Sequence, residues 1–350
     1  MSNKHLPHDL KQMQSLPLEA KIIMTQQRIR QWYEYWDGMV YVSFSGGKDS
    51  TVLKHIVDQM YDDVPSLFVN TGLEYPEIQK FAMSQKNVVT VRPEMRFDEV
   101  IKKYGYPVIS KEVSEVIYSV RHSKQGKTKS VRQKRLNGEL LDNQGKKSRF
   151  NCDNWRFMLE APFEVANHCC AVMKKKPAQK YAKESGRKQI VGTLACESRL
   201  RQQVWMKNGC NAFDAKKPSS QPLSFWTEQD ILHYLKKYKV PYCSVYGDIV
   251  SQDADGNEYD VPEEYMEAFS SVGGKSNLKT TGCDRTGCIF CMFGCHLEKT
   301  PNRFQRLKQT HPRQYQYCIG GGEMVDGKWQ PSKEGLGLGH VLDYIGVKYD

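Results

Sequence analysis

The sequence predicts an α/β fold, a parallel twisted sheet with helices on both faces, followed by a C-terminal cysteine-rich metal-binding segment. Three observations predict this class. Short apolar segments alternate with helical patterns, a glycine- and serine-rich loop separates the first strand from its helix, and four cysteines gather over residues 283–295. Strands that alternate with helices are typical of parallel sheets with crossover connections.

The N-terminal half supplies the alternation. Residues 9–36 place apolar side chains at helical spacing, which predicts one or two amphipathic helices. Strand–helix repeats follow, with strands expected at 39–45, 66–72 and 87–93 and helices expected over 51–60 and from about residue 75. Ligands of parallel sheets bind beyond the carboxyl ends of the strands, where SFSGGKDS and VNTGLEYPE lie.

Residues 121–149 interrupt this pattern. The segment carries ten Lys or Arg residues and two acids, Glu139 and Asp142. It is interpreted either as a solvated, mobile insertion or as a nucleic-acid contact arm.

The second half completes the sheet. Residues 160–205 have a helical pattern that is interrupted by a strand at 189–193, and 247–280 have the composition of loops. A helix is expected from Thr227, which serves as its N-cap, with Asp230 three residues later.

Composition restricts the function classes. The 51 Lys and Arg residues exceed the 40 Asp and Glu residues by 11, a balance that favours polyanionic partners. No apolar run approaches the roughly 20 residues of a membrane span, and the N-terminus has no apolar signal core, so we expect a soluble, cytoplasmic protein. Eleven cysteines without an export signal favour metal or redox chemistry over disulfides.

The loop over residues 45–50 reads SGGKDS. Its glycines let the backbone approach an anion closely, and the N-terminus of the following helix favours phosphate. Ser45 and Ser50 add hydroxyl donors, and Lys48 adds a mobile positive charge. The spacing differs from the GxxxxGK[ST] of Walker-type loops.

SGGKDS resembles the PP-loop of ATP pyrophosphatases. Four further segments resemble the phosphoadenosine phosphosulfate reductase family within that group, namely FVNTGLEYPE, CCAVMKKKP, GTLACESRLR and QPLSFWTEQDI. The resemblance covers roughly residues 20–300. It implies an adenine nucleotide alpha hydrolase-like fold and cleavage of ATP between its α and β phosphates, with Asp49 helping to position Mg²⁺.

The resemblance also implies site residues. Lys48, Asp49 and Arg201 are the expected catalytic residues. The expected nucleotide-binding residues are Ser43, Ser45, Gly46, Gly47, Lys48, Asp49, Ser50, Asn70, Thr71, Gly72 and Ser198. The order of patterns along the chain predicts three domains: N-terminal helices (1–36), a PP-loop domain (37–245) with the basic insertion 121–149, and a cysteine-cluster and C-terminal segment (246–350).

Two departures argue against a sulfonucleotide reductase. Leu194 stands where those reductases commonly have an arginine that grips the sulfate or phosphate. No cysteine follows Cys318, so the nucleophilic thiol near the end of those enzymes has no counterpart. Unaltered Lys48 and Asp49 instead favour the use of ATP.

The cysteines offer two ligand sets. Cys283, Cys288, Cys291 and Cys295 have four, two and three residues between them, a spacing that suits an iron–sulfur cluster or zinc. The family resemblance favours a [4Fe–4S] cluster, and the reductase pattern would use Cys169, Cys170, Cys288 and Cys291. We favour this second set and keep Cys283 and Cys295 in reserve, with zinc as the alternative metal.

These observations predict an ATP-dependent sulfur-transfer enzyme that acts on nucleic acid. The nearest resemblance is to the PP-loop component of DNA phosphorothioation systems, which favours DNA over tRNA as acceptor and a cysteine desulfurase as sulfur donor. A homodimer is the candidate assembly. The alternatives are an adenylyl-sulfate or phosphoadenosine phosphosulfate reductase, a PP-loop tRNA thiolase, or a nucleotide-binding regulator without turnover.

Overall fold

The computed structural model describes residues 4–252, 258–259 and 277–350. These residues form two compact units, each built from separate stretches of the chain. The sheet unit comprises residues 1–70, 74–92 and 178–286, and the cysteine unit comprises residues 71–73, 93–177 and 287–350. Much of the segment expected to be loops, 247–280, lies outside the described residues.

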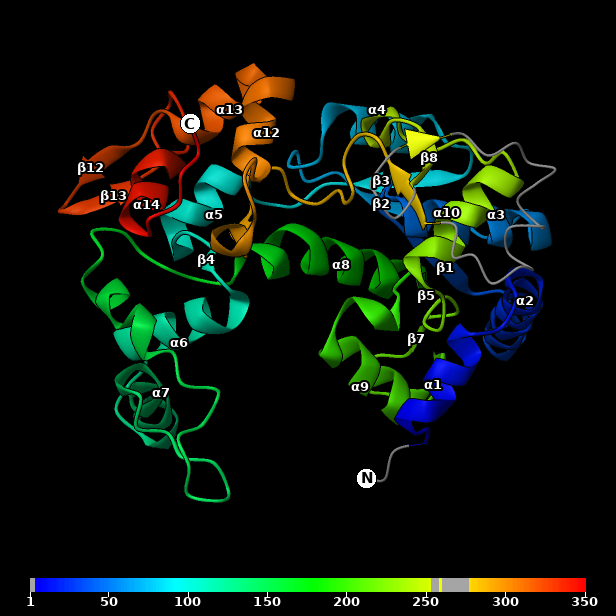
Figure 1. Ribbon diagram of the computed structural model, residues 1–350, viewed down its shortest axis with the longest axis horizontal. Helices are drawn as coiled ribbons and strands as arrows, with labels where there is room; N and C mark the ends of the chain where they lie inside the picture. The colour runs from blue at the N-terminus through cyan, green and yellow to red at the C-terminus, as the bar shows by residue number, and fades with distance from the viewer. Residues whose placement is uncertain (1–3, 253–257, 260–276) are drawn as a thin grey trace. The chain divides into compact units, whose positions relative to one another are not determined.

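A six-stranded sheet forms the centre of the sheet unit (Figure 1). Its order is β3-β2-β1-β5-β7-β6, and every neighbouring pair is parallel except β6 with β7. The strands are β1 (Val40–Phe44), β2 (Ser66–Val69), β3 (Val88–Val91), β5 (Lys188–Val191), β6 (Asn211–Ala212) and β7 (Ser219–Ser220). The predicted α/β class with a parallel sheet is confirmed.

Helices pack on this sheet through apolar stripes. In α3 (Lys48–Met60), Val52, Leu53, Ile56 and Val57 are fully buried, because positions three and four apart share one helix face. The other helices of the unit are α1 (Pro7–Gln14), α2 (Leu18–Tyr35), α4 (Pro76–Ser84), α8 (Lys176–Ser185, from residue 178 onward), α9 (Arg199–Asn208) and α10 (Glu228–Lys237).

The predicted start of α10 is confirmed. The Thr227 hydroxyl accepts the Asp230 N–H at 3.3 Å, and the Asp230 carboxylate accepts the Thr227 N–H at 2.6 Å. The same carboxylate accepts from the buried ammonium of Lys21 in α2 at 2.7 Å. One aspartate therefore both caps α10 and joins it to α2.

Two expectations of local structure are corrected. Only parts of 160–205 are helical, because Pro162 disfavours a helical conformation of Ala161, which is extended. A small sheet in the order β10-β8-β9 stands in the expected loop region, formed by β8 (Ile249–Gln252), β9 (Glu258–Tyr259) and β10 (Asn277–Thr280). Burial of Ile249 and Leu278 accounts for this pairing.

The cysteine unit is built mainly from short elements. Strand β4 (Val108–Ile109) pairs in parallel with β11 (Met292–Phe293), which joins segments far apart in the sequence. The unit also contains α5 (Phe97–Tyr104), α6 (Lys111–His122), α7 (Lys127–Asn137), a π-helical turn (Ala171–Lys175), α12 (Arg303–Thr310), α13 (Pro312–Ile319), β12 (Glu323–Val325), β13 (Lys328–Gln330) and α14 (Leu338–Tyr344).

The basic insertion contains an ordered helix, α7, which packs on α6. Arg132 and Arg135 form ion pairs with Glu115 and Glu112 of α6, and Leu136 is fully buried. The mobile-loop interpretation therefore does not hold for residues 127–137.

The compact units differ from the predicted domain boundaries. The N-terminal helices group with the sheet, because Ile29 and Trp32 of α2 belong to its hydrophobic core. Residues 93–177 group with the C-terminal segment, where β4 meets β11. Among the described residues, no helix is both long enough and apolar enough to cross a membrane.

Candidate functional site

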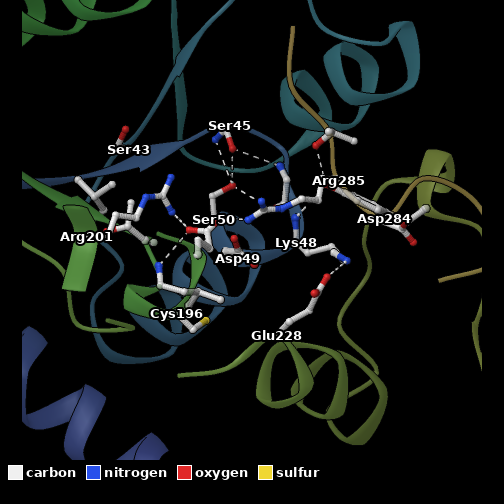
Figure 2. A pocket seen from close by; sticks show the side chains of 18 residues that line it. Ser43, Ser45, Lys48, Asp49, Ser50, Cys196, Arg201, Glu228, Asp284 and Arg285 are labelled. Carbon is white, nitrogen blue, oxygen red and sulfur yellow. Dashed lines mark hydrogen bonds and ion pairs between the residues drawn. The ribbon is translucent and has the colours of Figure 1, made fainter. Parts of the chain in front are cut away.

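The SGGKDS loop joins β1 to α3 and is fixed by its own side chains (Figure 2). The Ser50 hydroxyl donates to the Gly47 carbonyl at 2.9 Å and lies 3.0 Å from the Ser45 hydroxyl. Gly46 has a φ of +73°, and a Cβ there would lie 3.0 Å from Cγ2 of Ile78. Glycine is therefore required at this position by both conformation and space.

The loop presents the N-terminus of α3. Gly47 is the N-cap, and it has no side chain that could accept from the first N–H groups of the helix. The Lys48 N–H donates to the Tyr246 hydroxyl at 3.3 Å, and that hydroxyl lies 2.6 Å from Oγ1 of Thr286. Unfilled N–H groups and the helix dipole make such an end favourable for an anion.

A cavity of about 510 Å³ opens at this helix end, beyond the carboxyl ends of β1 and β5. Its volume suits a nucleotide-sized ligand. The lining residues all belong to the sheet unit and are Ser43, Ser45, Gly47, Lys48, Asp49, Ser50, Val191, Gly192, Thr193, Leu194, Cys196, Glu197, Arg201, Glu228, Tyr246, Asp284, Arg285 and Thr286.

Charged side chains pair with one another across the cavity (Figure 2). The buried Lys48 ammonium donates to Glu228 at 3.1 Å and lies 5.2 Å from the centre of the Tyr246 ring. Arg201 and Arg285 both form ion pairs with Glu197. The cations of the cavity are thus held by carboxylates of the same cavity.

Burial controls the acid at the helix start. Burial raises the pKa of the Asp49 carboxyl above its usual range, while the charges of Lys48 and Arg285 oppose that rise. The turn after β5 approaches this residue closely, because a Cβ on Gly192 would lie 3.0 Å from the Asp49 carbonyl oxygen. The first turn of α3, which carries Asp49, is therefore packed closely against the segment that follows β5.

Four cysteines influence one another in the cysteine unit. The Sγ atoms of Cys169 and Cys170 are 4.0 Å apart. The hydrogen bond to Cys170 and burial raise the pKa of Cys169, and the thiols of Cys291 and Cys288 raise it further. The pKa of Cys170 is lowered, first by the Cys169 thiol and then by the ammonium groups of Lys111 and Lys174.

The reserve cysteines have different surroundings. Cys283 belongs to the sheet unit, where its charge acts on Cys243. Cys295 is 1% exposed, and burial raises its pKa to about 11. Cys169, Cys170, Cys288 and Cys291 all belong to the cysteine unit, and the ammonium groups of Lys111 and Lys174 act on Cys170. These four therefore stay the predicted ligand set.

In the described part of the chain, no three His, Cys, Asp or Glu side chains converge on a point where they could hold one metal ion. The thiolates of a [4Fe–4S] cluster each bind a different iron atom, so they need not converge in that way.

The model of the phosphoadenosine phosphosulfate reductase domain matches residues 39–132 and 135–292. The chain belongs to this family. The match includes the phosphate loop, both lysine-flanked cysteines at 169–170 and the loop that carries Cys288 and Cys291.

Individual relatives are more distant. An uncharacterized protein of Methanocaldococcus jannaschii is 34% identical over 86 residues, which are 23% of this chain and 21% of that protein. The chain thus matches about a fifth of the length of that relative.

Solved structures share little sequence with the chain. The phosphoadenylyl-sulfate reductase of Candida auris is 16% identical, with a TM-score of 0.35, 70% of this chain covered and 92% of that chain. The U34-tRNA thiolase NcsA of Methanococcus maripaludis, solved with its [4Fe–4S] cluster, is 14% identical, with a TM-score of 0.31 and coverages of 74% and 76%.

Most residues predicted from the reductase-family motifs meet in the cavity, but some do not. Ser43, Ser45, Gly47, Lys48, Asp49, Ser50 and Arg201 line it. Gly46 shapes the loop without lining the cavity, and Ser198 caps α9 by accepting the Arg201 N–H at 3.3 Å. Asn70 is buried with its amide 3.8 Å from the Met83 sulfur.

Thr71 and Gly72 line a second cavity, of about 210 Å³, within the cysteine unit. The aromatic side chains in its lining are Phe97, Phe290 and Tyr317. The role of Thr71 and Gly72 in nucleotide binding stays a prediction.

Sequence reasoning missed several lining residues. Glu197 stands inside the quoted GTLACESRLR segment, where only its neighbours Ser198 and Arg201 were singled out. Asp284, Arg285 and Thr286 line the cavity, although they lie inside the stretch 283–295 for which the cysteines predict metal binding. For Arg285, the sequence shows only a guanidinium group near the cysteines. It does not reveal that the side chain pairs with Glu197, 88 residues away.

Proposed function

We propose that this protein is an ATP-dependent sulfur-transfer enzyme that cleaves ATP between its α and β phosphates. The observation that carries the proposal is the unaltered phosphate loop, whose Lys48 and Asp49 line one cavity at the N-terminus of α3. Loops of this kind bind phosphate through backbone N–H groups and a helix dipole.

In the first step, an acceptor oxygen attacks the α-phosphorus of ATP. The bond from that phosphorus to the β-phosphate oxygen breaks, and pyrophosphate leaves with the electron pair. Lys48 and Arg201, which both line the cavity, would balance the charge that develops on the leaving phosphates. Asp49 is the candidate ligand for Mg²⁺, which when bound shields the phosphate charge.

In the second step, hydrosulfide attacks the adenylated centre and displaces AMP, so that sulfur takes the place of oxygen. A cysteine desulfurase together with a thiol reductant would supply sulfur at this oxidation level. Cys169, Cys170, Cys288 and Cys291 would hold a [4Fe–4S] cluster, with zinc as the alternative; a bound cluster would supply iron that can bind sulfide or carry electrons. Lys111 and Lys174 would stabilise the thiolate form of Cys170.

The proposed acceptor is nucleic acid, with DNA in preference to tRNA. The net charge of +11 supports a polyanionic substrate. The exposed lysines of the insertion support it further, since Lys124, Lys127 and Lys134 face solvent while the nearby arginines are engaged by α6.

The test is the release of pyrophosphate from ATP by anaerobically purified protein, with duplex DNA or tRNA as acceptor and sulfide as donor. We expect release with the wild-type protein and its loss in K48A and D49N. D58N is the matched control, because Asp58 lies on the same helix, pairs with Lys54 and does not line the cavity.

A sulfonucleotide reductase is the second candidate, and membership of the phosphoadenosine phosphosulfate reductase family favours it. The side chain of Leu194 argues against it, because it lines the cavity, is 2% exposed and offers no charge to a sulfate. Protein that consumes no ATP with any acceptor but reduces adenylyl sulfate to sulfite would refute the ATP-dependent function.

A further inference from the structure

The cavity contains a pair of guanidinium groups that share one carboxylate. Arg201 comes from the first turn of α9, whereas Arg285 comes from the stretch between Cys283 and Cys288. One oxygen of Glu197 pairs with Arg201, and the other oxygen pairs with Arg285. Figure 2 shows the two arginines directed into the same part of the cavity, beside the Ser45–Ser50 loop.

Glu197 is the anchored member of this group. Its side chain is 14% exposed, and it also accepts the Leu194 N–H at 3.4 Å. The arginine side chains are 42% and 63% exposed, so they are the parts that can move. Two guanidinium groups share this one carboxylate, so a phosphate that entered beside them could replace it as their common partner.

The arginine pair lies beside the phosphate loop, because Arg201 and Arg285 line the same cavity as residues 47–50 of that loop. Both arginines are close enough to Asp49, at the start of α3, for their charges to lower the pKa of its carboxyl. A phosphate at that helix end would therefore lie within reach of both. Guanidinium groups bind phosphate in a two-pronged geometry, which suits Arg better than Lys for this role.

We infer that Arg285 is a second phosphate-binding arginine that acts with Arg201, and that Glu197 positions both guanidinium groups until a polyphosphate replaces its carboxylate. This inference rests on the proposed function and extends it, because it assigns a nucleotide-binding residue to the stretch between Cys283 and Cys288. In the absence of ligand, Glu197 keeps the two like charges together and competes with phosphate for them.

The test measures the affinity of the full-length protein for ATP and for inorganic pyrophosphate by calorimetry. R285A is expected to lose about tenfold to a hundredfold in affinity for both, because it loses charge-assisted hydrogen bonds. R285K is expected to recover part of the loss. R199A is the matched control, because Arg199 is exposed in the same turn of α9 as Arg201 and does not line the cavity.

E197Q tests the positioning role. Removing the competing negative charge is expected to tighten pyrophosphate binding several-fold, whereas a merely structural Glu197 would leave binding unchanged or weaker. Unchanged affinity in R285A overturns the role of Arg285, and equal or weaker binding in E197Q overturns the role of Glu197.

The pyrophosphate measurement distinguishes a failure of this inference from a failure of the proposed function. Wild-type protein that releases pyrophosphate from ATP while R285A binds normally would refute this inference and leave the proposed function standing. Wild-type protein that binds pyrophosphate through Arg285 but never cleaves ATP would refute the proposed function and support the inference.

Discussion

At the scale of single residues, the cysteines differ in the charged groups and thiols that surround them. Cys169 and Cys170 are adjacent, Lys111 and Lys174 lower the pKa of Cys170, and Cys288 and Cys291 act on Cys169. Cys283 instead acts on Cys243. Substitution of single cysteines can therefore distinguish the favoured ligands from the reserve cysteines.

We predict that C288S purified without oxygen loses its bound iron and acid-labile sulfide, whereas C283S keeps both. A thiolate bound to iron cannot be replaced by a hydroxyl without loss of affinity. Iron and sulfide analysis, with the absorbance near roughly 400 nm, provides the measurement. Iron loss in C283S with retention in C288S would contradict the assignment, and zinc in place of iron would identify the alternative metal.

Residues of the phosphate loop could be predicted because their chemistry is written in consecutive positions. The glycines of SGGKDS supply the backbone freedom, and its lysine supplies the charge, that an anion site needs. Gly46 has a positive φ in the structure. Glu228 and Arg285 could not be assigned, because their partners Lys48 and Glu197 come from distant segments. A side chain's partner is decided by tertiary packing, which a local pattern does not encode.

At the scale of elements, the strands at 39–45, 66–72 and 87–93 were predictable, because short apolar runs next to helical patterns are distinctive. Helix α7 was not, since its sequence is polar on all sides and buries only Leu136. Without an apolar stripe, its helical state is supported by ion pairs to α6.

Those ion pairs divide the basic residues of the insertion by role. We predict that the triple variant K124Q/K127Q/K134Q binds a short DNA duplex more weakly and has a shallower dependence on salt, by about one unit of slope for each lost phosphate contact. Fluorescence anisotropy over a range of salt concentrations is the measurement. The arginines stay intact because they hold α7 on α6.

The matched control for this triple variant is K86Q/K102Q/K183Q, which removes the same charge from exposed lysines elsewhere. An equal loss of affinity in both triples would show that net charge alone governs binding, and the insertion would then have no special contact role.

Two ion pairs join α2 to α10 at different depths. Lys21 is 2% exposed and pairs with Asp230, whereas Lys237 is 34% exposed and pairs with Glu19. We predict that K21M lowers the free energy of unfolding by about 3 kcal/mol, because it removes the buried cation and leaves the largely enclosed Asp230 carboxylate without it. K237M, which breaks the exposed pair, is expected to cost less than about 1 kcal/mol.

Chemical denaturation of both variants measures this difference. A K21M variant as stable as K237M would mean that Asp230 is satisfied by its bonds to Thr227 alone.

At the scale of the whole molecule, each compact unit carries one candidate site. The phosphate cavity is lined by the sheet unit, and Cys169, Cys170, Cys288 and Cys291 belong to the cysteine unit. The sequence places these sites in alternating stretches of the chain, since residues 93–177 separate β3 from β5. The linear domain boundaries predicted from the sequence could not express this arrangement, because only pairings such as β4 with β11 reveal it.

This division predicts which segments bound ATP will protect from hydrogen exchange. At about a hundred times its dissociation constant, a ligand adds about 2.7 kcal/mol to the stability of the state that binds it. Hydrogen exchange that requires the cavity to open should then slow by about a hundredfold in peptides that cover 45–51, 192–201 and 284–286. Peptides that cover α13 and α14 should exchange at the same rate with and without Mg-ATP, because no residue of either helix lines the cavity. Hydrogen exchange with mass spectrometry measures all of these segments in one experiment. Slowing confined to the segments of the second cavity, around Thr71, Phe97 and Tyr317, would place the nucleotide there instead and would remove the phosphate loop from its proposed role.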